Sequence, residues 1–293
     1  MRSRVMTIAP LVVALLIGGI VSAVTMPSAD ERDALNPIAY SVEAAAAAGS
    51  ARFDFSISFD VPGGAGTGDG SLSFGGQGEM AFEPPAARLT MTFAGLPGPD
   101  EATSGFSMEM VALGTEIFIK MPEEAAVAPT PWIKVDLSAI EGLEDLGQLE
   151  DLADQDPSKQ LEYLRGASDD FEEIGPEPVR GVDTTHYRAV ISLRKTVDVA
   201  PADQRDALRR MTDKLIEETG IESIPAEVWI DDEGLPRRMR WEQDLSGVPD
   251  APSGASLSIT MELFDFGVDV DVQPPPDDQV TDMSELLAQF APG

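Results

Sequence analysis

The sequence contains no cysteine and a single histidine, His186, among its 293 residues. Without cysteine the chain cannot form a disulfide scaffold, a thiolate zinc site, a c-type haem attachment or a thiol nucleophile. Basic residues are also few, because 20 Lys and Arg stand against 52 Asp and Glu, for a formal net charge of −32. A surface of this sign repels nucleic-acid backbones and polyphosphates, so the composition argues against nucleic acid as a partner.

His186 and paired acids are the candidates for catalysis, and none of them forms a specific motif. No nucleophile-elbow sequence is present, so we interpret His186 as a strand histidine hydrogen-bonded to its surroundings. Asp231-Asp232 and Asp169-Asp170 have the residue types of glycosidase carboxylates, but such pairs arise by chance among 52 acids. The aspartates within residues 151–156 lack the spacing of a calcium loop. We therefore predict a non-enzymatic protein with no catalytic residue, cofactor or metal site.

The first 23 residues have the features of an export signal. Arg2 and Arg4 precede an uncharged stretch from Met6 to Met26 that is dense in Val, Leu and Ile. The small residues of Val21-Ser22-Ala23 predict cleavage after Ala23, and Pro27-Ser28-Ala29 offers a second site. The alternative is an uncleaved signal anchor, because the run approaches the ~20 residues that span a bilayer. In both cases we expect a linker over residues 24–36 and one exported domain over residues 37–293, secreted or held at the cell envelope.

Alternation of apolar and polar residues predicts about ten strands. In the clearest case, Phe53, Phe55, Ile57, Phe59 and Val61 alternate with polar residues, so the apolar side chains share one face. The same alternation occurs over residues 72–82, 89–93, 106–110, 117–121, 133–137, 187–193, 224–230, 235–241 and 257–263. The links read as hairpins and no regular βαβ repeat is present, so we expect an antiparallel sheet.

Helices are predicted around this sheet. They cover residues 37–48, 201–219 and 282–290, and two shorter ones lie within residues 143–165. The stretch from Asp136 to Ile174 carries 13 acids and two bases, which suits a mobile acidic cover better than a core.

One-sided strands must bury their apolar face, and the helices are too few to wrap both faces of the sheet. We therefore predict an α+β fold, a curved antiparallel β half-barrel with helices covering its concave apolar face. We expect a hydrophobic ligand cavity lined by Phe53, Phe55, Ile57, Phe59, Phe74, Met91, Met108, Met110 and Ile119. The alternative is a core closed by its own side chains, and Gly76 and Gly78 suit either a close approach or a bend.

Basic residues gather between Arg180 and Arg240, where 11 bases nearly balance 12 acids. Arg205 and Arg209 lie on the predicted helix 201–219, and Arg237 lies on the hairpin that follows it. If these elements are neighbours, the three side chains provide contacts for an anionic lipid head group. The alternative is ordinary ion pairing with local acids such as Asp206 and Asp213.

Four segments together resemble a known family. The segment from Gly175 to Tyr187 resembles the LppX/LprG-type lipoproteins of actinobacteria, relatives of the LolA lipoprotein carriers. Trp132-Ile133-Lys134, the stretch from Ile224 to Asp231, and Asp278-Gln279-Val280 fit the same resemblance in the same order. It implies an open β half-barrel with helices in its mouth that binds acyl chains or whole lipids. The sequence departs from the family at residues 20–24, where the acylated lipobox cysteine has no counterpart.

The sequence thus predicts an exported cell-envelope protein that binds lipid acyl chains in a hydrophobic cavity, close to a membrane, as a lipid carrier or chaperone. The alternative is an envelope sensor or regulatory module that binds a protein partner and no lipid.

Overall fold

The computed structural model describes residues 37–61, 72–94 except 83, 106–136 except 121 and 123–127, 171–199, 205–249 and 251–290. The predicted signal or anchor, the linker and the acidic helices of the middle lie outside these residues. The strands are β1 (Ser50–Asp60), β2 (Leu72–Ala81), β3 (Ala86–Ala94), β4 (Phe106–Leu113), β5 (Glu116–Lys120), β6 (Trp132–Asp136), β7 (Phe171–Pro176), β8 (Thr184–Ser192), β9 (Ser223–Asp231), β10 (Pro236–Asp244), β11 (Ser256–Phe264) and β12 (Val280–Asp282). The helices are α3 (Pro37–Ala48), α6 (Leu193–Val199), α7 (Arg205–Thr219) and α8 (Met283–Phe290), with a 3-10 turn, η6 (Asp277–Gln279).

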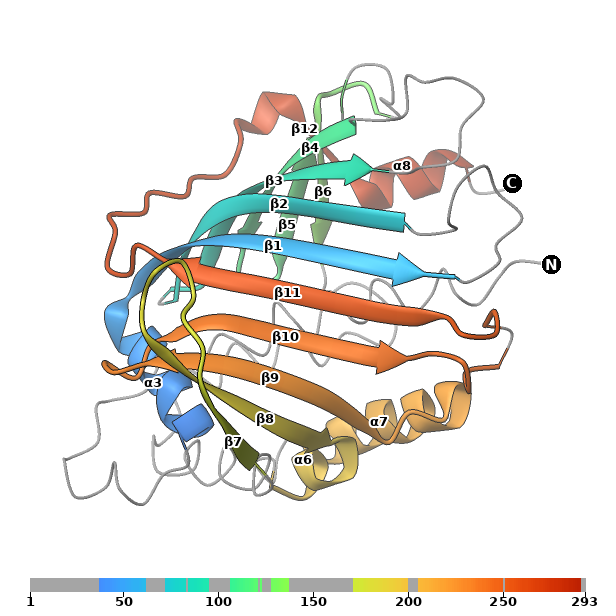
Figure 1. The fold of residues 1–293 in the computed structure, drawn as a ribbon. Helices are drawn as coiled ribbons and strands as arrows, with labels where there is room; N and C mark the ends of the chain where they lie inside the picture. The colour runs from blue at the N-terminus through green and yellow to red at the C-terminus, as the bar shows by residue number, and fades with distance from the viewer. Residues whose placement is uncertain are drawn as a thin grey trace.

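All twelve strands form one sheet in the order β12-β6-β5-β4-β3-β2-β1-β11-β10-β9-β8-β7. Strands β1 to β6 form one meander and β7 to β11 form a second, and the pairing of β1 with β11 joins them. Every pairing is antiparallel except that of β12 with β6. The sheet curls, so that β3 to β6 turn away behind β2, and β12 and β7 remain as two unjoined edges (Figure 1).

One face of the sheet is apolar because the strands alternate and their register keeps the alternation in phase. Phe55 lies opposite Met261 of β11 on one side and opposite Gly76 of β2 on the other. Asp54 lies opposite Glu262 on the other face of the sheet, where the hairpin tip 177–183 brings Arg180 to both carboxylates. This tip crosses in front of the sheet, on the side from which the sheet curls away (Figure 1). The polar face is therefore convex and the apolar face concave.

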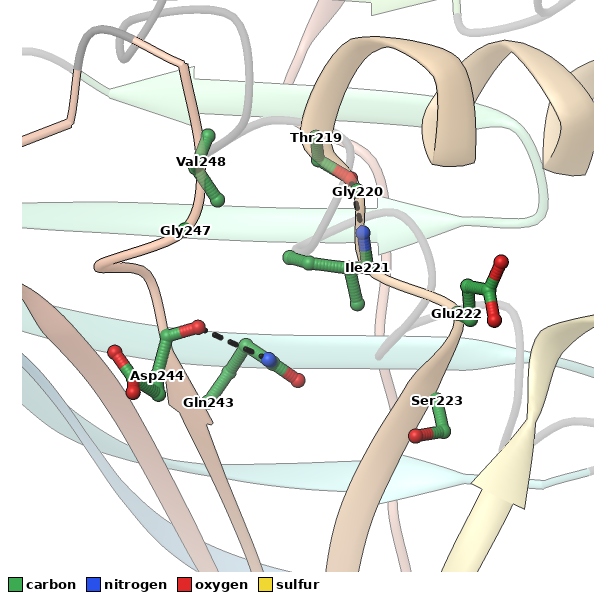
Figure 2. A pocket seen from close by; sticks show the side chains of 9 residues that line it. All are labelled: Thr219, Gly220, Ile221, Glu222, Ser223, Gln243, Asp244, Gly247 and Val248. Atoms are coloured by element: carbon green, nitrogen blue, oxygen red, sulfur yellow. Dashed lines mark hydrogen bonds between the residues drawn. The ribbon is translucent and has the colours of Figure 1, made fainter.

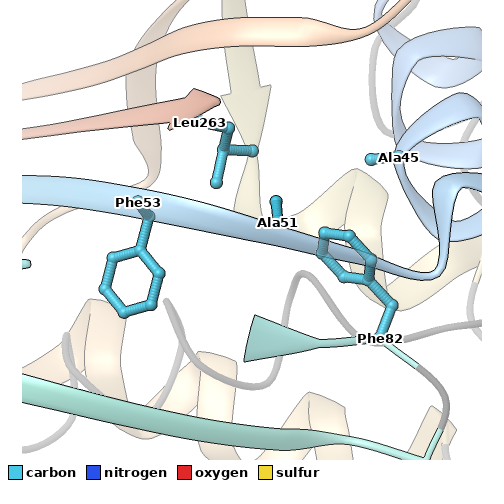
Figure 3. Close-up of a cluster of buried hydrophobic side chains, with 5 residues drawn as sticks. All are labelled: Ala45, Ala51, Phe53, Phe82 and Leu263. Atoms are coloured by element: carbon cyan, nitrogen blue, oxygen red, sulfur yellow. The ribbon is translucent and has the colours of Figure 1, made fainter. Parts of the chain in front are cut away.

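Helix α3 covers one end of the concave face. It contacts β1, β9 and β10, and Ala45 packs with Ala51, Phe53, Phe82 and Leu263 in a buried cluster (Figure 3). Gly49 ends the helix with a φ of 79°, a conformation that glycine adopts without strain. The cluster therefore fixes α3 against the seam between the two meanders.

The opposite end of the concave face is closed by the link between β10 and β11. Leu245, Val248 and Ala255 of this link are buried and pack against Phe59 and Leu257, which end the apolar rows of β1 and β11. The remaining helices pack outside this area, with α6 against β8 and α7, and α8 against β6 and β12. Within the described residues, no helix is long and apolar enough to cross a membrane.

The predicted fold class is confirmed, as are the ten strands and the three helices that lie in the described residues. Two strands were not predicted: β7, whose side chains are mostly exposed, and β12, which has three residues. The apolar row of β8 was predicted to run through Leu193, but this residue begins α6. Strand β11 ends at Phe264, and Asp265 turns the chain with a φ of 50°.

Gly76 and Gly78 of β2 lie directly beneath aromatic rings of β1, which need the space that a side chain at these positions would fill. A Cβ at Gly76 would lie 2.1 Å from the carbonyl oxygen of Thr90 and 2.8 Å from the Phe55 ring. A Cβ at Gly78 would lie 2.4 Å from the carbonyl oxygen of Arg88 and 2.7 Å from the Phe53 ring. The glycines therefore admit the protein's own rings and a neighbouring strand, so the bend or ligand approach expected there is not needed to explain them.

We predict that Gly76→Ala lowers the free energy of unfolding by about 1–3 kcal/mol, because the added methyl group meets backbone that cannot move independently. Chemical denaturation of the two proteins measures the difference. Gly247→Ala is the control, since its Cβ meets no atom within 4 Å and should change stability by less than about 1 kcal/mol. Equal stability of Gly76→Ala and the parent protein would contradict this packing.

Candidate functional site

The nine residues predicted to line a cavity lie on the concave face. Phe53, Phe55, Ile57 and Phe59 come from β1, and cross-strand pairs extend the row through Phe74, Met91, Met108, Met110 and Ile119. Phe53 and Ile57 are buried, with 3% and 7% of their surface exposed, and the other seven are only half-buried. The structure thus brings the nine together on one surface, and their role in ligand binding stays a prediction.

The second meander extends the same apolar surface, which the sequence analysis did not assign to the site. Met261 and Ile259 of β11 lie opposite Phe55 and Ile57, and Met239 and Trp241 of β10 follow beside them. All but Ile259 are half-buried. The alternation of these strands was visible in the sequence, but nothing in it pairs β11 with β1. The candidate binding surface therefore extends over two more strands than expected.

The three arginines proposed for a head group do not come together. Arg205 begins α7 and Arg209 is exposed one turn later, with Nη1 3.9 Å from Asp206 Oδ1. Arg237 lies next to the turn of the β9–β10 hairpin, whereas α7 leads into the start of β9 at the opposite end. At the turn, Nε of Arg237 donates to the buried Asp231 carboxylate at 2.6 Å. Strands of this length separate the two ends by roughly 25 Å. The structure therefore does not bring the three side chains together, and Arg237 has a structural partner in Asp231. Their role with a head group stays a prediction.

His186 lies on the convex face among groups that do not suggest catalysis. Its ring stacks on Trp229 at 4.1 Å, Nδ1 lies 3.1 Å from Glu177, and Nε2 lies 3.6 Å from Glu227. Neither nitrogen makes a well-aligned hydrogen bond, which differs from the hydrogen-bonded histidine that we expected. These contacts include no hydroxyl nucleophile. Among the described residues, no three His, Asp or Glu side chains are grouped to hold a metal ion.

Beside His186, the hairpin tip 177–183 is held to the sheet by ion pairs. Arg180 has a φ of 49°, lies 4.2 Å from the centre of the Phe264 ring, and donates to Asp54 and to Glu262. Arg238 also donates to Glu262, at 2.7 Å. Burial disfavours the Glu262 carboxylate, but the hydrogen bonds from Arg180 and Arg238 outweigh that effect and lower its pKa. Arg180 therefore ties the tip to both meanders, through Asp54 of β1 and Glu262 of β11.

A pocket of about 330 Å³ opens where α7, β9 and β10 meet (Figure 2). It is lined by Thr219 to Ser223, Gln243, Asp244, Gly247 and Val248. None of the nine predicted cavity residues is in this lining. Gln243 follows Met239 and Trp241 on the concave face of β10, and it could have been recognised in the sequence as an amide at an apolar position. The pocket is thus a polar site at the rim of an apolar surface.

We predict that Glu262→Gln lowers the free energy of unfolding by about 1 kcal/mol at about pH 7. The two arginines donate three hydrogen bonds to the carboxylate, whereas an amide has no charge and accepts at one oxygen only. The folded pKa of Glu262 lies below its unfolded value of about 4.3, so its stabilising effect is complete above that value. The effect is lost as pH falls through the lower, folded pKa. Denaturation at both acid and neutral pH should therefore show a difference that shrinks on acidification. A difference that is independent of pH would contradict this assignment.

No model of a known protein family matches the sequence, and no curated protein matches it. Among solved structures, the chain is similar to lipoprotein LppX of Mycobacterium tuberculosis, with 17% identity, a TM-score of 0.46, and 81% of this chain and 96% of that chain covered. It is similar to LprF of Mycobacterium bovis, with 13% identity, a TM-score of 0.39, and 82% and 98% covered. A putative outer membrane lipoprotein-sorting protein domain from Vibrio parahaemolyticus has 10% identity, a TM-score of 0.25, and 76% and 88% covered. LppX belongs to the LppX/LprG-type lipoproteins that the four sequence segments resemble.

Proposed function

We propose that this protein is a non-enzymatic, exported carrier or chaperone that binds lipid acyl chains on the concave face of its sheet. One observation carries the proposal: the apolar rows run across both meanders, yet most of their side chains stay half-buried. A closed core would bury such side chains, since each gains stability from leaving water. The half-buried rows are what an acyl chain requires, because it binds by covering apolar surface.

Methionine gives this surface the ability to adapt to different chains. Six methionines lie on the concave face and are half-buried: Met80, Met91, Met108, Met110, Met239 and Met261. Two pairs face each other directly, Met91 with Met108 and Met239 with Met261. Their unbranched side chains repack around irregular apolar shapes. Burial of each methylene group of a ligand contributes about 0.8 kcal/mol, so one long acyl chain is enough for stable binding after the cost of association.

The placement of the protein is part of the same proposal. We assign residues 1–23 to an export signal or anchor, residues 24–36 to a linker and residues 37–293 to one lipid-binding domain near a membrane. Export agrees with the acidic composition, because charged surface keeps an extracellular protein soluble.

A second candidate is an envelope sensor that binds a protein partner. It is favoured by Phe171, Ile174 and Val190, which are 40%, 44% and 49% exposed on β7 and β8 at one edge of the sheet. An edge strand with exposed apolar side chains can pair with a strand of another protein. A partner at this edge would leave the concave face unused.

We predict that Met108→Glu reduces affinity for a fluorescent fatty acid at least about tenfold, because a carboxylate on the concave face must lose its hydration when the chain binds. Ser107→Glu is the matched control, since the neighbouring residue points to the convex face of β4 and is exposed. Fluorescence titration measures both, and thermal unfolding checks that both variants remain folded. Equal loss in both variants, or no loss in either, would refute binding on the concave face.

A further inference from the structure

We infer that the pocket between α7, β9 and β10 is a head-group site for a lipid whose polar end donates hydrogen bonds and carries no negative charge. This inference rests on the proposed binding of acyl chains, and it adds the class of head group. Uncharged hydroxylated heads and amine-bearing heads meet the condition, whereas phosphate and carboxylate heads do not.

The position of the pocket is right for a head group. Gln243 lies opposite Leu257, so its side chain is on the same face as the apolar rows. Ile221 and Val248 line the pocket and also pack in the cluster that contains Phe59 and Leu257. A lipid whose chain follows the apolar rows to this end therefore meets the pocket without crossing the sheet.

The polar atoms in the pocket accept hydrogen bonds. Nε2 of Gln243 donates to the backbone oxygen of Asp244 at 3.1 Å, which leaves Oε1 as the free end of the amide (Figure 2). Oε1 is buried, and no group of the described residues donates to it. A buried acceptor without a donor has given up its hydrogen bond to water, so a hydroxyl or amine placed there recovers a hydrogen bond. The Ser223 side chain turns toward the same space (Figure 2).

The electrostatics of the pocket disfavour an anion. Helix α7 ends at Thr219, which lines the pocket, so the negative end of the helix dipole lies there. The last turn of α7 contains Glu217 and Glu218 and no basic residue. None of the nine lining residues is Lys or Arg, and Glu222 and Asp244 add carboxylates. Hydrogen bonds from the Ser246 hydroxyl and backbone lower the pKa of Asp244, which therefore stays ionised at neutral pH.

Two lipids with the same acyl chain and glycerol test whether the pocket prefers an uncharged head group to an anionic one. Monopalmitoylglycerol and palmitoyl lysophosphatidic acid differ only in the phosphate, and each competes with the methyl ester of a fluorescent fatty acid, whose head is uncharged, for the full-length protein at low ionic strength. We expect the uncharged lipid to bind about three- to tenfold more tightly. Gln243→Met should weaken its binding about three- to tenfold. Gln77→Met, on the exposed convex face of β2, should not change it.

A second variant keeps the test valid if Gln243→Met fails to fold. Glu222 is exposed, so Glu222→Lys should fold and shift the preference toward the phosphate lipid. Tighter binding of the phosphate lipid by the parent protein, or a preference that neither variant changes, would overturn the head-group site while leaving acyl-chain binding intact. If the fluorescent methyl ester does not bind at all, the proposed function fails and the inference fails with it.

Discussion

The antiparallel pairing of β1 with β11 is the constraint on which the rest of the molecule depends. It joins strands that are about 200 residues apart, and its register sets Phe53 opposite Leu263 and Ile57 opposite Ile259. A shift of one residue would turn the apolar row of one meander to the opposite face. The continuous concave surface therefore exists only in this register. The glycines of β2, which accept the Phe53 and Phe55 rings, hold the same region from the other side.

Both ends of the concave face are packed, and between them most described side chains other than those of the β1–β11 seam are half-buried. Helix α3 buries one end through Ala45, and Leu245 and Val248 bury the other, while the rows between them remain half-buried. On the convex face, Arg180 connects the two meanders through Asp54 and Glu262, and Val111, Phe118 and Trp132 form a buried cluster on β4 to β6. Stability is thus supplied in part at the ends and on the outside, which agrees with the proposal that the intervening apolar surface binds a ligand.

The periodicity of the strands was enough to predict the fold class, because alternation of apolar and polar residues determines which face of a sheet is buried. Short or exposed strands such as β7 and β12 carry little of this signal. The sequence could not place the arginines relative to one another, because sequence distance does not reveal which end of a hairpin a residue occupies. Arg237 lies at the β9–β10 turn, whereas Arg209 lies on α7. Gln243 was missed since an amide in an apolar row is informative only when its neighbours are known.

Native mass spectrometry of the protein purified from its own host, before and after extraction with organic solvent, tests acyl-chain binding most directly. Bound lipid should appear as added mass that disappears on extraction, and the extract should contain molecules with long acyl chains. The bare polypeptide mass in both samples, from a protein shown to be folded, would contradict the account. In that case the half-buried rows of the concave face would need another explanation.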